Sequence, residues 1–125
     1  MTKPLRVLIL EDQPADAELV TRELRKSGIP FVAKQGATRE DFLAQLRNSA
    51  PELTLADYSL PGYDGLSALA AAQEQCRGVP FISVSGSMGE EQAIETLHQG
   101  ATNYVLKQRL PRLGLAARCT SKQKC

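Results

Sequence analysis

Short apolar segments alternate along this chain with segments of helical periodicity. The first, LRVLIL at 5–10, is nearly continuous, as expected for a strand that is covered on both faces. VPFISVS at 79–85 is rich in β-branched and aromatic residues, whereas PFVAKQG at 30–36 is a weaker strand candidate. ELTLA at 52–56 and TNYVL at 102–106 complete a set of five strands. Strands and helices in alternation predict an α/β fold, in which right-handed crossovers build a parallel sheet with helices on both faces.

The helical segments carry start and stop signals. Thr38 and Asp64 are candidate N-caps, and Gly28 and Gly100 follow the last periodic residues of two segments. No internal repeat or linker interrupts the pattern, and only the last segment is short. The predicted helices are 15–28, 39–49, 65–76, 89–100 and 112–119.

Length and composition indicate one globular domain. The chain has 125 residues, of which 42% are hydrophobic and 23% charged, and this balance argues against disorder. We expect residues 1–118 to form the domain and the polar, basic residues 119–125 to form a tail that is disordered or truncated. The formal charge of +1 gives no global reason for binding nucleic acid or membranes. Since the N-terminal apolar run is too short for a signal peptide or a spanning helix, we expect a cytoplasmic location.

The cysteines and the histidine do not indicate a disulfide framework or a zinc site. Cys76, Cys119 and Cys125 form neither an even set nor a C-x-x-C pair, so free thiols are the expected state. His98 is the sole histidine of the sequence, which excludes a site built from several histidines.

Charged and polar residues stand where the predicted strands end. In LTLADYSLPGYDG an apolar run stops at the carboxylate of Asp57. Glu11 and Asp12 follow the first strand, Ser85 ends the fourth, and Lys107 follows the fifth. In an open parallel sheet the ligand site lies at the carboxyl ends of the strands, so we expect these side chains to converge on one edge.

The residue types at this edge suit phosphoryl transfer. Three clustered carboxylates repel one another, and a hard divalent cation such as Mg²⁺ removes that repulsion. The carboxylate of Asp57 is a possible nucleophile for forming an acyl phosphate. Lys107 supplies a point charge for a bound phosphoryl group, and Ser85 supplies a hydroxyl donor.

Four motifs occur in the order of the predicted strands: LILEDQPAD, LADYSLPGYDG, FISVSGS and GATNYVLK. Through them, residues 5–118 resemble the receiver domain of bacterial two-component response regulators. The segment YVLKQRLPRLG looks like receivers that are joined in one chain to a sensor kinase or another signalling module. The resemblance implies a flavodoxin-like fold of five βα units with strand order 2-1-3-4-5.

The resemblance also implies a role for each site residue. Asp57 matches the phosphoryl acceptor, and Glu11 and Asp12 match the acidic pair that helps to hold Mg²⁺, with Mn²⁺ as a possible substitute. Ser59, two residues after the acceptor, offers its backbone carbonyl as a further metal ligand. Lys107 matches the lysine that contacts the phosphoryl group.

Further positions match the family's switch and its control of dephosphorylation. Ser85 matches the switch hydroxyl, and Tyr104 stands at the switch aromatic. Ser59 and Ser87 occupy positions that tune the access of water to the acyl phosphate. In the family's scheme, phosphorylation shifts a two-state equilibrium and changes the face made by the fourth helix, the fifth strand and the fifth helix.

The implied partners are a histidine kinase or phosphotransfer protein as donor, and an output protein or a domain of the same full-length chain as target. A homodimer is a further option, whereas direct binding to nucleic acid or to a membrane is not expected. The implied chemistry is limited to self-catalysed, Mg²⁺-dependent phosphorylation and dephosphorylation, so the chain is not expected to be an enzyme. Two other functions stay open: an interaction module that needs no phosphorylation, and a small flavodoxin-like or phosphohydrolase enzyme, which the missing G-x-x-x-x-G-K-[ST] loop disfavours.

Overall fold

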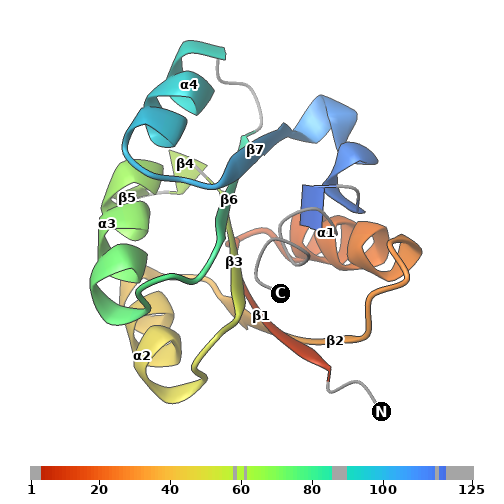
Figure 1. The fold of residues 1–125 in the computed structure, drawn as a ribbon, viewed down its shortest axis with the longest axis horizontal. Coiled ribbons are helices and arrows are strands. Elements are labelled where there is room, and N and C mark those ends of the chain that lie inside the picture. Colours follow the sequence, from red (N-terminus) through yellow and green to blue (C-terminus); the bar gives the residue numbers. More distant parts are fainter. Residues whose placement is uncertain (1–3, 58, 61, 86–89, 115, 118–125) are drawn as a thin grey trace.

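The main sheet of the protein contains five parallel strands (Figure 1). The computed structural model describes residues 4–57, 59–60, 62–85, 90–114 and 116–117. Along the sheet the strands follow the order β2-β1-β3-β6-β7, which confirms the predicted order 2-1-3-4-5 because β4 and β5 lie outside this sheet. The five strands are β1 (Leu5–Leu10), β2 (Phe31–Gly36), β3 (Leu53–Asp57), β6 (Phe81–Ser85) and β7 (Asn103–Leu106).

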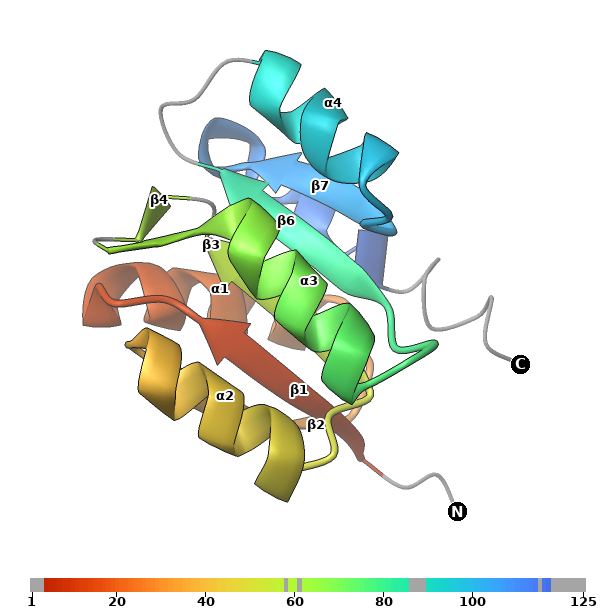
Figure 2. The ribbon, with the colours of Figure 1, turned by 90° about the vertical axis from the view of Figure 1, so that its left-hand side faces the viewer.

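Helices cover both faces of the sheet, as the alternating pattern predicts. In Figure 1, α2, α3 and α4 lie on one side of the strands, and α1 lies on the other with the C-terminal helical residues 112–114 and 116–117. Figure 2 shows α2, α3 and α4 side by side on the face turned toward the viewer. The helices are α1 (Pro14–Lys26), α2 (Arg39–Asn48), α3 (Gly65–Gln75) and α4 (Glu90–His98).

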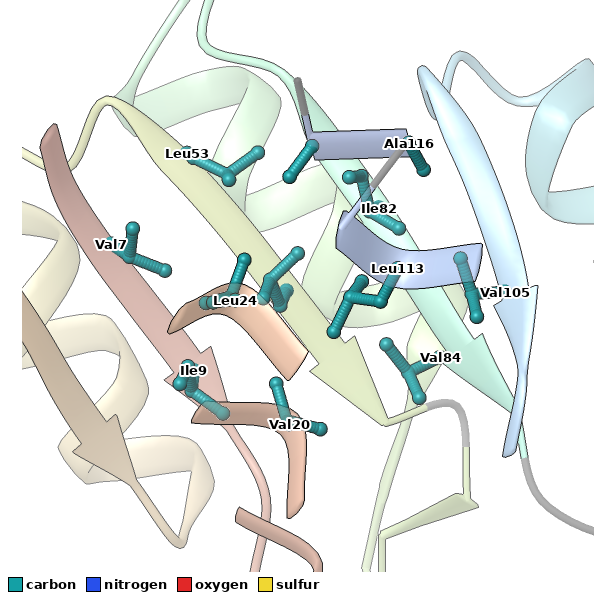
Figure 3. Close-up of a cluster of buried hydrophobic side chains, with 12 residues drawn as sticks. Val7, Ile9, Val20, Leu24, Leu53, Ile82, Val84, Val105, Leu113 and Ala116 are labelled. Atoms are coloured by element: carbon teal, nitrogen blue, oxygen red, sulfur yellow. The ribbon is translucent and has the colours of Figure 1, made fainter. Parts of the chain in front are cut away.

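The strands alternate their side chains between two apolar clusters. In β1, Val7 and Ile9 belong to the cluster under α1, whereas Leu8 and Leu10 belong to the cluster under α2 and α3. All four are at most 3% exposed, so β1 is covered on both faces as its sequence predicts. Figure 3 shows the first cluster, to which α1, the C-terminal helical residues and four strands contribute. Its labelled side chains are Val7, Ile9, Val20, Leu24, Leu53, Ile82, Val84, Val105, Leu113 and Ala116.

The helix caps follow the sequence closely. The Thr38 side chain accepts a hydrogen bond from the backbone N–H of Asp41 at 3.1 Å, and Asp64 accepts one from that of Ser67 at 2.8 Å. Both bonds satisfy N–H groups that have no partner within the first turn of a helix. Two predicted N-caps are therefore confirmed.

The segment between β3 and α3 contains a feature that the sequence did not predict. Two short strands, β4 (Ser59–Leu60) and β5 (Tyr63–Asp64), pair antiparallel as a separate small sheet. Gly62 lies between them with φ 73°, a left-handed conformation that glycine adopts without steric cost. Each strand has only two residues, which is too short for a periodic pattern.

The end of the chain also differs in detail from the prediction. A single 3₁₀ turn, η1 (Lys107–Arg109), follows β7 before the helical residues 112–114 and 116–117. The remainder of the predicted last helix and the tail at 119–125 lie outside the described residues.

Two further observations concern membrane spanning and the cysteines. Within the described ranges, no helix is both long enough and apolar enough to cross a bilayer. Cys76 is a free thiol, whereas Cys119 and Cys125 lie outside the described residues.

Candidate functional site

Three strand ends bring charged side chains to one edge of the sheet. Glu11 directly follows β1, Asp57 is the last residue of β3, and Lys107 directly follows β7. The backbone N–H of Glu11 donates to the carbonyl of Gly36 at 3.0 Å, which extends the pairing of β1 with β2 up to this residue. Since parallel strands end at the same edge, segments that are distant in the sequence meet there, as we predicted.

Glu11, Asp12 and Asp57 form a carboxylate cluster at this edge. One oxygen from each of them lies within 4.8 Å of the other two. Glu11 is 2% exposed and Asp57 is 8% exposed, while Asp12 is half-buried. Oxygen donors of this kind suit Mg²⁺ or Mn²⁺, and a divalent cation offsets the repulsion among the three negative charges. The residues present therefore fit the predicted metal ion.

The ammonium group of Lys107 connects this cluster to α1. Its Nζ lies 3.0 Å from Oε1 of Glu11, 3.2 Å from Oδ2 of Asp57 and 2.9 Å from Oδ2 of Asp16. The Lys107 side chain is 23% exposed, so these charge-assisted hydrogen bonds are only partly screened by water. Lys107 thus provides positive charge beside the predicted phosphoryl acceptor.

The surroundings shift the pKa values of Glu11 and Lys107. Burial raises the pKa of Glu11 above its ordinary value, and the nearby charge of Asp57 adds to this effect, although Lys107 opposes it. For Lys107 burial acts to lower the pKa, but the hydrogen bonds to Asp16 and Glu11 outweigh it and raise the pKa. Lys107 therefore stays protonated at neutral pH. For Glu11, the neighbouring groups only partly offset the free-energy cost of burying its negative charge.

Asp16 is a site residue that the sequence analysis missed. It lies in the first turn of α1, where an acidic residue is common because it complements the positive end of the helix dipole. Pro14 stands at the start of α1, and proline is favoured at the first helical position. Because α1 begins at Pro14, soon after β1 ends at Leu10, its first turn lies close to the end of that strand.

For the other residues predicted at the site, the structure gives mainly the position of the backbone. Ser85 ends β6 in register with Leu106, the residue before Lys107, and Ser59 lies in β4, two residues after Asp57. The side chains of Ser85 and Ser59 lie outside the described part of the structure. Tyr104 is half-buried in β7, opposite Ser83.

The predicted roles of these residues in switching and in dephosphorylation stay predictions. Ser87, the other residue predicted to tune dephosphorylation, lies outside the described residues.

Comparison with known sequences identifies a matching family. Residues 7–117 match the response regulator receiver domain. The transcriptional regulatory protein BaeR of Escherichia coli is 31% identical over 121 residues, which cover 96% of this chain and 49% of BaeR. The response regulator protein FleR of Pseudomonas aeruginosa is 30% identical over 102 residues, covering 82% of this chain and 21% of FleR. The chain thus spans about half or less of the length of these relatives.

Comparison with solved structures supports the same fold. A CheY-like response regulator receiver domain protein from Methanospirillum hungatei has a TM-score of 0.81 and 27% identity, with 98% of each chain covered. The receiver domain of NtrX from Brucella abortus has a TM-score of 0.83 and 26% identity, with 93% of this chain and 98% of that domain covered.

Proposed function

Because this chain belongs to the response regulator receiver domain family, we propose that it is a phosphorylation-controlled switch of two-component signalling. Asp57 accepts a phosphoryl group from a histidine kinase or a phosphotransfer protein in the cytoplasm. The observation that carries the proposal is the position of Lys107, whose Nζ donates to both Glu11 and Asp57 within the three-carboxylate cluster. The proximity of the Asp57 carboxylate, the Lys107 cation and a carboxylate cluster that fits a metal ion thus supports the proposal.

The transfer step follows from these groups. A carboxylate oxygen of Asp57 attacks the phosphorus of the phosphohistidine, and the P–N bond breaks as the new P–O bond forms. The bonding electron pair remains on the imidazole nitrogen, which takes up a proton. Lys107 stays protonated and neutralises negative charge on the transferred group. Glu11, Asp12, Asp57 and the backbone carbonyl of Ser59 would hold Mg²⁺ or Mn²⁺, and a bound ion would supply further positive charge to the phosphoryl oxygens.

The acyl phosphate then changes the equilibrium between two conformations. Ser85 and Tyr104 respond to the phosphoryl group, and the face around α4, β7 and the C-terminal helical residues presents a changed surface to a partner. That partner is an output protein, a domain of the same full-length chain or a second copy. Attack of water on phosphorus releases inorganic phosphate and restores the carboxylate, a step whose rate Ser59 and Ser87 adjust. These reactions make the chain a phosphoacceptor rather than an enzyme.

Intact-mass spectrometry after incubation with acetyl phosphate and Mg²⁺ tests the proposal. We expect a single phosphoryl adduct that requires Mg²⁺ and disappears in Asp57→Asn. Asp41→Asn is the matched control, because Asp41 is an exposed carboxylate in the first turn of α2. The adduct should persist in that variant.

Two results would contradict the switch. Absence of an adduct together with absence of beryllofluoride binding would favour an interaction module that works without phosphorylation. Turnover of a phosphorylated substrate at a rate independent of Asp57 would favour the enzyme alternative.

We also propose that residues 1–118 form the domain and that residues 119–125 form its tail. Limited proteolysis tests these bounds, and we expect cleavage only within the tail.

A further inference from the structure

Among the described residues, Lys107 has three carboxylate acceptors, as many as it has N–H donors. An ammonium group carries three N–H donors and no acceptor. The acceptors are Oδ2 of Asp16 at 2.9 Å, Oε1 of Glu11 at 3.0 Å and Oδ2 of Asp57 at 3.2 Å. A new anionic acceptor at this site therefore competes with carboxylates that already hold Lys107.

The three carboxylates differ in the free-energy cost of losing their hydrogen bond from Lys107. The side chains of Glu11 and Asp57 are 2% and 9% exposed, so either one would become a buried carboxylate without this cation. Phosphorylation converts the Asp57 carboxylate into an acyl phosphate, so Asp57 itself presents the new oxygens and the competing carboxylates are Glu11 and Asp16. The Asp16 side chain is 36% exposed and can be hydrated by solvent when it loses Lys107. Asp16 is thus the acceptor whose displacement costs least.

Asp16 acts through Lys107 rather than through the metal site. Among the described carboxylates, those that come together as possible metal ligands are Glu11, Asp12 and Asp57, and Asp16 is not one of them. It reaches Lys107 from α1, on the opposite side of the sheet from α4 (Figure 1). Removing its carboxylate therefore releases a donor of Lys107 and leaves the predicted metal ligands in place.

Resting on the proposed function, we propose that Asp16 is a positioning residue that holds Lys107 in the unphosphorylated protein and competes with the phosphoryl oxygens for it. Because of this competition, phosphorylation is less favourable than it would be if Lys107 contacted only Glu11 and Asp57. Asp16 thereby sets the threshold of the switch.

A purely structural role of Asp16 predicts a different result. As an acidic residue in the first turn of α1, Asp16 also interacts favourably with the helix dipole. If this were its whole contribution, Asp16→Asn would lower the stability of the protein but would not change its affinity for a phosphoryl mimic. The two roles are separated by measuring binding and unfolding on the same variants.

Beryllofluoride with Mg²⁺ is a suitable probe, because it takes the place of the phosphoryl group on an aspartate. Its dissociation constant is measured by titration on the full chain for wild type, Asp16→Asn, Asp16→Glu and Glu18→Gln. Glu18 is the matched control, since it is an exposed carboxylate on the same helix and pairs with Arg22 at 4.0 Å. We expect the dissociation constant to fall about two- to fivefold in Asp16→Asn, the range for a partly exposed ion pair. Glu18→Gln and Asp16→Glu should stay near the wild-type value.

A second measurement reads the position of Lys107 directly, without Mg²⁺ or beryllofluoride. In protein labelled with ¹⁵N-lysine, ammonium protons held in ion pairs exchange slowly with water and give an NMR signal. The Lys107 signal, assigned by its loss in Lys107→Met, should be sharp in wild type and broadened in Asp16→Asn. Glu18→Gln should leave it sharp.

The outcomes separate the inference from the proposed function. An unchanged beryllofluoride affinity or an unchanged Lys107 signal in Asp16→Asn overturns the role of Asp16, while wild-type binding still supports the switch. Failure of wild type to bind beryllofluoride overturns both the switch and the competition. A tighter complex in Asp16→Asn, with the broadened signal, supports both.

Discussion

The Nζ atom of Lys107 lies 3.0 Å from Oε1 of Glu11, although 96 positions separate the two residues in the sequence. They follow β7 and β1, which do not pair with each other because β3 and β6 lie between them. The Lys107 side chain therefore reaches over the ends of two strands and contacts Asp57 on the way. Lys107 thus links the outer strand β7 to the inner strands β3 and β1, and it brings a positive charge to the carboxylate cluster.

Removing the cation should destabilise the metal-free protein. Lys107→Met leaves Glu11 and Asp57 without their shared partner, and we expect the free energy of unfolding to fall by about 1–3 kcal/mol at pH 7. Urea denaturation monitored by circular dichroism measures the change. Lys26→Met is the control, because Lys26 forms an exposed ion pair with Glu23 at 3.4 Å. Equal effects of the two substitutions would show that the site gains no stability from Lys107.

Stability in the absence of divalent cations should depend on pH through Glu11. Its raised pKa means that the folded state binds the proton more tightly than the unfolded state, whose ordinary value is 4.5. Protonated Glu11 makes its full contribution to the free energy of unfolding below pH 4.5. This contribution is lost as the pH rises through the folded-state pKa of Glu11.

The variant Glu11→Gln isolates this effect, because it cannot titrate. The unfolding free energy of wild type minus that of Glu11→Gln should fall as the pH rises from about 4.5, the ordinary carboxyl value. Urea titrations at a series of pH values in EDTA measure this difference. A difference that is constant or that increases with pH would contradict the raised pKa.

Magnesium should stabilise the folded protein. Binding to the folded state alone adds about 2.7 kcal/mol when the free ion is present at a hundred times its dissociation constant. Thermal unfolding with and without Mg²⁺ should show this increment in wild type and a much smaller one in Asp12→Asn. Glu74→Gln, which changes an exposed residue near the end of α3, should keep the full increment. Identical increments in all three proteins would place the ion elsewhere.

The core under α1 should be sensitive to a cavity. Leu55 is 1% exposed in β3, and Leu55→Ala should lower the free energy of unfolding by about 2–5 kcal/mol. Leu19 is 42% exposed on α1, so Leu19→Ala removes the same atoms where water already reaches them. We expect a change of less than about 0.5 kcal/mol for a surface substitution of this kind. Similar losses in both variants would contradict the assigned burial.

The parallel sheet could be predicted from local patterns. LRVLIL reads as a strand covered on both faces, and Thr38 and Asp64 cap the helices that follow them. These signals depend on residues that are close together in the sequence, so they need no knowledge of the tertiary structure. The small sheet of β4 and β5 could not be predicted, because two-residue strands are too short to show a periodic pattern of apolar residues.

The sequence by itself determined which residues stand at the strand ends: Glu11 and Asp12, Asp57, and Lys107. Their convergence was predictable because the carboxyl ends of parallel strands share one edge. Asp16 was not predictable in this way, since an acid in the first turn of a helix is already explained by the helix dipole. Only the tertiary structure decided that its carboxylate accepts from Lys107, 91 positions away. That contact depends on how α1 packs against the sheet, and such packing is set by the whole apolar core rather than by any local pattern.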